Sequence, residues 1–481
     1  MKTVARMSVR IKVSCRRSRT RHPLASTLAC SLLLAAFPIS ARALTSPITA
    51  ALPSGTPVSA APVSRPGADG VASAARMSMS TAAGDVAAQA SRPSATGAAD
   101  PAPQTPPAAP RAGAPAGTPT SPQALTAAID KLGSLDFPIR MQASRTVRRT
   151  SAAQAVPALI KAVQSHADGY VRYRALVLLS GFGDPRVHDV MASVLDDKND
   201  RLRTVAYSYF AANPDPALAA GLLTKLEPED SEFVRPSLVR ALAALETDPK
   251  VQPVLLREVN RGQDFFRSTV IEALGDYRAA YAVPALLALA KVDGPLQDDA
   301  VVALGQIGDK KSLDTIAALQ RSAPRERQPA LAASICLLGV NCDTHERFLV
   351  ETLKFSVKNA GFQDLIRSAA RGLSHLAIAG RDFSWDSLIQ VGQETHDPAR
   401  APIALALASA AIRSPERILQ AIERAANRQG ALGLLRDGFD MLEEDFAEEQ
   451  FYIQARSVYW KLPQGSPTRK AAEAMITTLE F

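Results

Sequence analysis

The residues of this chain best suited to proton transfer or metal binding are its histidines, and those beyond residue 43 are scattered. They are His166, His188, His345, His375 and His396. A metal site needs several converging ligands, and only one His-Glu pair occurs, at His345-Glu346. The sequence also lacks H-E-x-x-H, G-x-S-x-G, G-x-G-x-x-G and P-loop motifs. We therefore predict no metal, no cofactor and no catalytic centre, and expect each histidine to cap a helix or face solvent.

A two-residue phrase, an apolar residue followed by arginine, returns at nearly constant spacing along the chain. It occurs at Ile139-Arg140, Val171-Arg172, Leu202-Arg203, Val234-Arg235 and Phe266-Arg267. The arginines recur about every 32 residues, and self-similarity at such a period is typical of a solenoid. In a solenoid each unit buries its apolar face on its neighbours, and the result is usually a binding surface.

Each unit contains two amphipathic helices, and the second unit shows both. Its first helix carries apolar residues at spacings of three and four and is expected to end at the break 181–185, Gly-Phe-Gly-Asp-Pro. Its second helix follows the break. Aspartates at such breaks are expected to cap the second helix of each unit. They are Asp184, Asp248, Asp276 and Asp309.

The phrases of these units resemble a known family. The Val-Arg opening, the Ala-Leu-Gly-x-Ile-Gly-Asp break at residues 303–309 and the Val-Pro-Ala-Leu resumption at residues 156–159 and 283–286 resemble HEAT repeats, of the short type named for phycocyanin lyases. The resemblance covers residues 123 to about 425. It implies an all-α, right-handed α-solenoid of about nine helical hairpins with a concave face used for protein binding. It implies no activity, because one fold serves many functions.

The first 43 residues have the pattern of a secretory signal peptide. They contain nine Lys or Arg and no acidic residue, followed by an apolar run from Leu24 to Phe37 and the site Ala41-Arg42-Ala43. We predict export to the periplasm or the cell exterior with cleavage after Ala43, and no membrane span after cleavage. An uncleaved anchor is the alternative, but a transmembrane helix needs about 20 apolar residues.

The predicted leader also carries the basic charge of the chain. The net charge of the full chain is +8. Removing the nine basic residues of the leader turns the charge to −1, so no general excess of Lys and Arg remains for phosphate binding. We predict no nucleic-acid partner.

Three segments follow the predicted signal peptide of residues 1–43. Residues 44–122 are rich in Ala, Pro, Ser and Thr and cannot bury enough apolar area to fold, so they are predicted to be a disordered linker. The repeats are predicted to occupy residues 123–429. Beyond them the phrases stop while apolar residues continue, which predicts a helical C-terminal cap at residues 430–481. Aromatic residues between 451 and 460 leave a partner site in this cap as an alternative.

Two cysteines remain after the leader, Cys336 and Cys342. On a continuous helix six residues rise about 9 Å, beyond the roughly 4.4–6.8 Å between Cα atoms that a disulfide accepts. A left-handed turn at Gly339 would bring them together. An oxidising compartment and an even count predict a disulfide, with buried free thiols as the alternative.

A series of cations lies near the ends of the predicted second helices. The series is Lys161, Lys225, Arg257, Lys291, Arg321 and Lys354. Stacked units would place it along one groove, where it would hold an acidic protein partner. The alternative is structural, because cations near helix C-termini interact favourably with the helix dipole.

These patterns predict an exported, non-catalytic scaffold that binds a protein through its concave face. One alternative is an accessory recognition module of a secreted hydrolase or a cell-envelope complex. Another is a helical enzyme with its site in the irregular units opening near Arg327, Arg367 and Arg400. A histidine meeting carboxylates in one groove would favour the enzyme. HEAT-type iron hydroxylases carry several His-Glu pairs, and phycobilin lyases act in the cytosol, so both families fit poorly.

Overall fold

The computed structural model describes residues 120–442 and 445–479. The predicted signal peptide, its cleavage site after Ala43 and the predicted linker up to residue 119 lie outside the described residues. The helical part begins at Pro122, where the hydroxyl of Ser121 accepts a hydrogen bond from the amide of Ala124 at 3.2 Å and caps the first helix.

The described residues form α-helices joined by short turns and contain no β-strand. After α1 (Pro122–Asp130) come nine helical pairs, the number that the sequence predicts. They are α2 (Phe137–Arg149) with α3 (Ala152–Ser165), α4 (Gly169–Leu179) with α5 (Arg186–Ser193), α6 (Asp200–Ala212) with α7 (Ala219–Leu226), α8 (Arg235–Ala243) with α9 (Val251–Glu258), α10 (Asp264–Asp276) with α11 (Val283–Ala290), α12 (Gln297–Ile307) with α13 (Leu313–Ser322), α14 (Gln328–Leu337) with α15 (Cys342–Val357), α16 (Gln363–Ile378) with α17 (Asp382–Glu394), and α18 (Arg400–Arg413) with α19 (Pro415–Arg424). The chain continues with α20 (Arg428–Leu442), α21 (Asp445–Lys461) and α22 (Pro467–Thr478).

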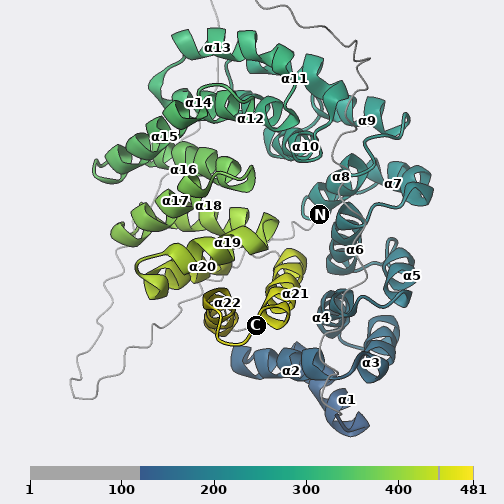
Figure 1. The fold of residues 1–481 in the computed structure, drawn as a ribbon. Coiled ribbons are helices and arrows are strands. Elements are labelled where there is room, and N and C mark those ends of the chain that lie inside the picture. Colours follow the sequence, from purple (N-terminus) through teal and green to yellow (C-terminus); the bar gives the residue numbers. More distant parts are fainter. Residues whose placement is uncertain (1–119, 443–444, 480–481) are drawn as a thin grey trace, which may run out of the picture. The chain divides into compact units, whose positions relative to one another are not determined.

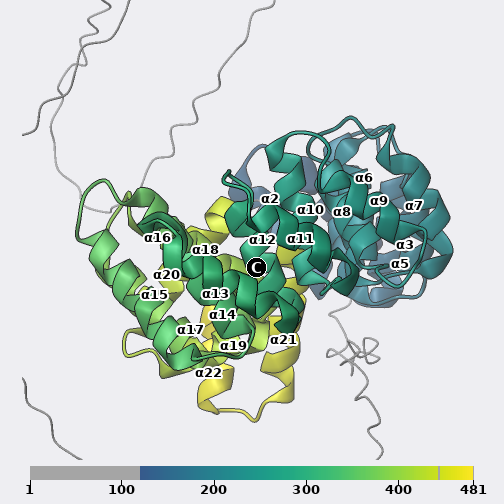
Figure 2. The same ribbon diagram turned by 90° about the horizontal axis from the view of Figure 1, so that it is seen from above.

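The pairs stack side by side, so that first helices pack on first helices and the array curves. Figure 1 shows α3, α5, α7, α9, α11 and α13 on the outside of the curve and α4, α6, α8, α10, α12 and α14 on its inside. Figure 2 shows the same stack from above. The all-α solenoid expected from the repeat period is confirmed.

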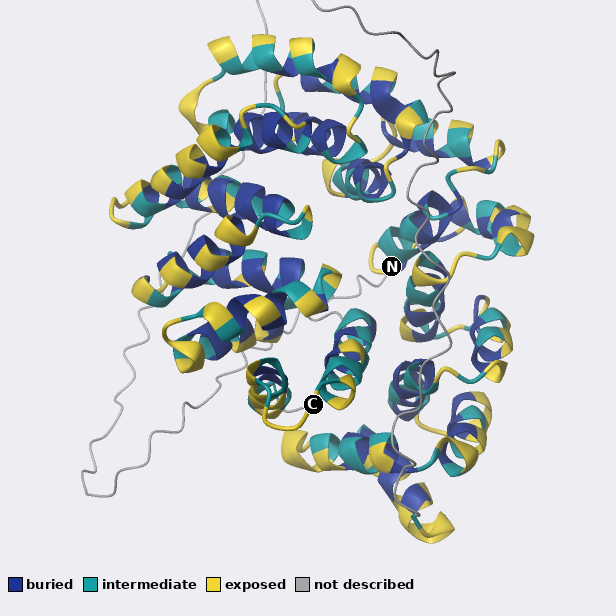
Figure 3. Ribbon diagram, in the orientation of Figure 1, coloured by how far each residue is buried: buried dark blue, intermediate teal, exposed yellow. Residues whose placement is uncertain are grey.

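Buried apolar side chains pack between the helices, and Figure 3 marks the buried residues on the ribbon. They form two clusters, one from α1 to α14 together with Phe446 of α21, and one from α14 to α22. Leu331 and Ile335 of α14 belong to the first cluster, and Ala333 and Cys336 of the same helix belong to the second. Because each buried large aliphatic side chain stabilises the fold by about 1.5–3 kcal/mol, the stack is held by many contacts between neighbours, and α14 joins its halves.

The arginine of the opening phrase binds backbone that precedes its own helix. Nε of Arg172 donates to the carbonyl of Val163 at 2.7 Å, and Nε of Arg267 donates to that of Val259 at 2.9 Å. A guanidine nitrogen of Arg400 likewise donates to the carbonyl of Gly392 at 2.8 Å. These carbonyls lie at or near the ends of second helices, where backbone acceptors lack helical partners. In these three units the arginine therefore caps the preceding helix.

Three of the four aspartates at the breaks cap the turn that follows, as predicted. Oδ1 accepts from the amide two residues ahead in Asp184, Asp248 and Asp309, at 3.0, 2.8 and 3.0 Å. Asp276 does not cap. It lies in the last turn of α10, three residues ahead of the capping position, and its carboxylate binds arginines instead.

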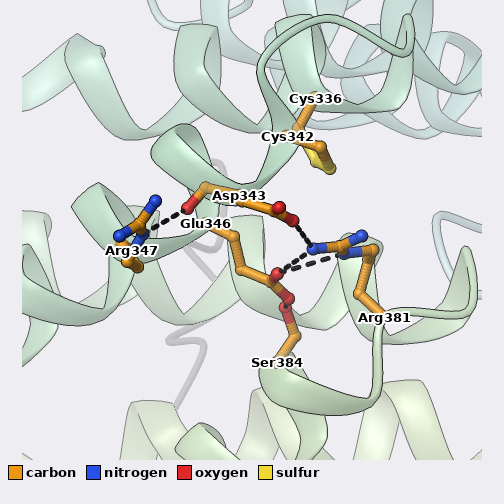
Figure 4. Close-up of a disulfide and its surroundings, with 7 residues drawn as sticks. All are labelled: Cys336, Cys342, Asp343, Glu346, Arg347, Arg381 and Ser384. Carbon is orange, nitrogen blue, oxygen red and sulfur yellow. Dashed lines mark hydrogen bonds and ion pairs between the residues drawn. A yellow bond between two sulfur atoms is a disulfide. The ribbon is translucent and has the colours of Figure 1, made fainter.

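The structure joins Cys336, near the end of α14, to Cys342, at the start of α15, with Cα atoms 4.2 Å apart (Figure 4). Gly339 has φ 85°. Its amide donates to the carbonyl of Cys336 at 2.8 Å, and the amide of Val340 donates to that of Ile335 at 3.2 Å. This is the left-handed turn that a disulfide across a helix end requires.

The C-terminal helix α21 packs against the first units, in a closing contact made by Arg148, Arg174, Asp445 and Glu449. Nε of Arg148 donates to both carboxylate oxygens of Glu449 at 3.0 and 3.1 Å, and Arg174 pairs with Asp445. The exposed fractions of the Arg148 and Glu449 side chains are 6% and 3%. The guanidinium of Arg148 also lies 4.6 Å from the ring centre of Tyr452. The segment predicted as a cap therefore also joins the two ends of the helical array.

No helix among the described residues combines the length and the apolar composition needed to cross a membrane.

Candidate functional site

A pocket of about 380 Å³ opens where the C-terminal turns of six inner helices meet. The helices are α8, α10, α12, α14, α16 and α18. Its charged and polar lining comprises Arg240, Asp276, Tyr277, Arg278, Gln306, His375 and Arg413. Gly275, Leu337, Ile378 and Ala379 complete the wall. We call it the central pocket. Its volume is in the range of pockets that bind small ligands.

Asp276 is the anion at the centre of this lining. Its Oδ2 lies 2.8 Å from a guanidine nitrogen of Arg240, and its Oδ1 lies 2.6 Å from one of Arg413. The side-chain amide of Gln306 donates to Oδ1 at 3.0 Å. Burial raises the pKa of this carboxyl, but the charges of Arg413 and Arg240 outweigh burial and hold the pKa below its ordinary value. Asp276 is therefore ionised.

A second arginine bridge lies beside the pocket. Arg371 of α16 pairs with Asp299 of α12 at 2.6 Å and with Glu272 of α10 at 2.5 Å. Asp299 also accepts from the hydroxyl of Ser268 at 2.7 Å. With Arg413, these pairs tie α16 and α18 to α10 and α12, which belong to units far apart in the sequence. The inner helices are thus locked around the pocket by charge pairs.

His375 is neutral in this environment. Burial, with the charges of Arg371 and Arg413, lowers the pKa of His375 to about 3. The amide of Gln306 lies 3.3 Å from Nδ1, and an amide nitrogen only donates, so Nδ1 accepts and the ring proton lies on Nε2. The ring is a weak base at neutral pH and serves as a hydrogen-bonding wall.

This histidine predicts a pH dependence of stability. Because the folded state holds the pKa near 3 while the unfolded value is 6.5, its contribution is fully present above pH 6.5 and is lost as the pH falls toward 3. We expect H375Q, which keeps an acceptor for Gln306, to lose less stability than the wild type between pH 7 and pH 4. Thermal unfolding of both proteins across this range is the measurement, and parallel curves would contradict the assignment.

The predicted cation series does not line the central pocket. Lys161, Lys225, Arg257 and Arg321 lie on α3, α7, α9 and α13, Lys291 directly follows α11, and Lys354 lies on α15. Figure 1 shows α3, α7, α9, α11 and α13 on the outer layer. The placement of this series in a concave groove is corrected, because the ends of the second helices face outward. Three members are also paired with acids, Lys225 with Asp196, Arg257 with Glu258 and Lys354 with Glu351. Binding of an acidic partner by the series stays a prediction.

The only His-Glu pair of the sequence has a structural use. Glu346 is buried, and its carboxylate accepts from Nε of Arg381 at 3.0 Å and from the hydroxyl of Ser384 at 2.5 Å (Figure 4). Arg381 also pairs with Asp343 beside the disulfide. Across residues 120–442 and 445–479, no three His, Cys, Asp or Glu side chains are grouped to hold a metal ion. Glu346 therefore joins α15 to α17.

The sequence reading missed that Asp276, His375 and Arg413 meet. One signal was present. The Ala-Leu-Gly that ends α10 aligns with the Ala-Leu-Gly of α12, which places Asp276 opposite Gln306, inside the helix, and Arg278 opposite Gly308. No sequence pattern near Asp276 indicates its pairing with Arg413, which lies 137 residues away.

The comparisons agree with this architecture. The family model described as HEAT repeats matches residues 123–211, the region of the first two helical pairs and the start of the third. Residues 123–211 therefore contain HEAT repeats. The curated proteins compared with it include none that matches.

Solved structures similar to this protein cover about three quarters of its chain. A structure of importin beta is 11% identical to this chain, with a TM-score of 0.30. The match covers 73% of this chain and 57% of the importin beta chain. The complex of CpcE and CpcF of phycocyanin lyase from Nostoc sp. PCC7120 is 17% identical and covers 70% of this chain and 100% of the other, with a TM-score of 0.22.

Proposed function

We propose that this HEAT-repeat protein is an exported, non-catalytic scaffold that binds a protein partner on its inner face. The observation that carries the proposal is the central pocket, where six inner helices meet and charged side chains come from α8, α10 with the turn that follows it, and α18. Stacked repeats provide an extended inner face for a partner. The central pocket lies on that face, where six units meet, and offers a specific binding site within it. Export rests on the leader pattern, with cleavage after Ala43 into the periplasm or the cell exterior.

A helical enzyme is the second candidate, since the structure does bring a histidine and a carboxylate into one pocket. The state of both groups weighs against it. A general base works best with a pKa near the operating pH, whereas His375 has a pKa of about 3 and Asp276 is tied to two arginines. The pocket supports binding better than proton transfer. A recognition module within a secreted or cell-envelope assembly is compatible with the same site.

Two alanines allow a matched test of the binding face. Ala379 is exposed on the wall of the central pocket, and Ala288 is exposed on the outer helix α11. A photoreactive phenylalanine derivative is placed at each position of the full chain in the cells that express it. We expect illumination to yield one crosslinked protein from position 379 and none from position 288. Crosslinking only from position 288 would refute binding on the inner face.

Fractionation of the same cells reports on export. The mature protein is expected in the envelope or the medium, with Leu44 at its amino terminus. Recovery of the intact leader in the cytosol would contradict the exported role and leave the crosslinking result to stand on its own.

A further inference from the structure

Arg278 has a backbone conformation that side-chain-bearing residues rarely adopt. It follows α10 with φ 55°, in the left-handed region. Its amide donates to the carbonyl of Gly275 at 3.1 Å, and the amide of Ala279 donates to that of Leu274 at 2.9 Å. This is the turn that ends many helices with glycine, because the left-handed region costs a residue with a Cβ roughly 1 kcal/mol or more.

Other inner helices of this chain use glycine at the same place. The corresponding left-handed residues after α12, α14 and α16 are Gly308, Gly339 and Gly380, with φ of 81°, 85° and 104°. Among the described residues only Arg278 and Asn341 have positive φ without being glycine, and Asn341 precedes α15 rather than ending an inner helix. A strained position that persists is often one that function requires.

The side chain of Arg278 has no structural use that explains this strain. It is exposed, and it lines the central pocket. Its guanidinium makes no hydrogen bond or ion pair with residues 120–442 and 445–479, whereas Arg240 and Arg413 share Asp276. Arginines near helix C-termini often bind the last carbonyls and favour the helix dipole. That explains a cation here in general, but Arg278 makes no such bond.

The charge of the lining favours an anion. Arg240, Arg278 and Arg413 carry three positive charges, Asp276 carries one negative charge, and His375 is neutral. The uncompensated charge is therefore positive, although the six helix C-termini reduce it. Leu337, Ile378 and Ala379 add an apolar wall to the same pocket. A carboxylate on a short aliphatic stem matches both parts, because the stem contacts the apolar wall while its oxygens reach the guanidinium.

We infer that the central pocket receives a carboxylate side chain of an acidic peptide segment of the partner, and that Arg278 is its principal ligand. The inference rests on the proposed binding of a protein on the inner face. In the complex, the guanidinium of Arg278 exchanges its contact with solvent for a charge-assisted hydrogen bond to the carboxylate. Arg240 and Arg413 hold Asp276 and thereby shape the floor of the pocket.

The variant R278G separates binding from folding, because glycine is the residue that this backbone favours. Its thermal midpoint is expected to equal or exceed that of the wild type. The probe is an acetylated, amidated hexapeptide with one glutamate among alanines and leucines, titrated calorimetrically into the full chain. We expect R278G to weaken its binding about tenfold, since a hydrogen bond to a charged group is worth roughly 1.5–3 kcal/mol.

The controls test charge, position and source. The peptide with glutamine in place of glutamate should bind the wild type about tenfold more weakly than the glutamate peptide does. R278G should bind the two peptides with equal affinity. R347Q removes an exposed arginine of α15 outside the pocket, and it should bind the glutamate peptide as the wild type does. Succinate binding as tightly as the peptide would point to a small-molecule site and overturn the assignment to a peptide.

Unchanged affinity of R278G, or absence of any peptide binding to the wild type, would overturn the inference. If position 379 still crosslinks to a partner in either case, the proposed function stands without it. If peptide binding depends on Arg278 while position 379 captures nothing, the carboxylate site stands and the proposed protein partner fails.

Discussion

Replacing Glu449 with alanine is expected to lower the free energy of unfolding by about 3–5 kcal/mol and to open the closing contact. The side chains of Glu449 and Arg148 are almost fully buried, with exposed fractions of 3% and 6%. Removing one partner of a buried ion pair leaves the other charge without compensation, and that loss is of this size. One guanidine nitrogen of Arg148 is already buried without a partner among the described residues. E449A would leave further hydrogen-bond donors of the same guanidinium buried without a partner.

Two measurements check this prediction. Denaturant unfolding gives the loss of stability, and small-angle scattering gives the radius of gyration, which should rise as α21 leaves α2 and α4. E473A is the matched control, because Glu473 is exposed on α22, and it should change neither quantity appreciably. The double variant R148M/E449L should recover much of the stability, since apolar residues of similar volume replace a buried pair at little cost. Wild-type stability and dimensions in E449A would refute the closing contact.

Gly181 offers a way to open the same contact without changing charge. A Cβ at this position would lie 3.0 Å from Cδ1 of Ile453 on α21 and 3.4 Å from Oε1 of Glu449. G181L should therefore reproduce the expansion seen in scattering without the penalty of an unpaired buried charge. Its comparison with E449A separates the effect of opening from the effect of the orphaned Arg148.

Replacing Trp385 with alanine is expected to lower the free energy of unfolding by about 3–5 kcal/mol, because it leaves a large cavity in the second apolar cluster. Trp385 of α17 is fully buried, and its indole nitrogen donates to the carbonyl of Ala377 at 3.0 Å. In a stacked array stability is a sum over neighbours. The units from α16 onward should therefore melt first, while α1 to α13 keep their helices.

The chain holds its own control for this variant, because it has two tryptophans. Trp460 on α21 has an exposed fraction of 45%, so W460A should change stability by only about 0.5 kcal/mol. Circular dichroism should show two steps for W385A, and hydrogen exchange should place the early step in α16 to α20. A single transition at the wild-type midpoint would show that the W385A cavity does not lower the stability, and it would contradict the prediction.

The solenoid was predictable because its determinants are local. The period of the apolar-Arg phrase identifies five of the nine pairs, and three break aspartates cap as the sequence predicts. The left-handed turn at Gly339 brings Cys336 and Cys342 together by short-range backbone geometry. Each of these features depends on residues within about one repeat of each other.

The site was not predictable in the same way. The cation series was correctly placed on second helices, but which layer faces inward depends on curvature, which accumulates from small rotations between successive units. Asp276 was read as a cap because its neighbours in the repeat pattern are caps. Its true partner Arg413 lies 137 residues away, on a helix that only the curvature of the array brings near.

The sequence by itself determined the repeated helical pairs, the order in which they stack and most of the residues that end their helices, because these follow from apolar periodicity and turn chemistry between neighbours. Only the tertiary structure decided that α21 closes onto the first units and that Asp276, His375 and Arg413 share one pocket. Contacts of this kind join residues far apart in the chain. The sum of the rotations between successive units positions them, and no local pattern of residues specifies that sum.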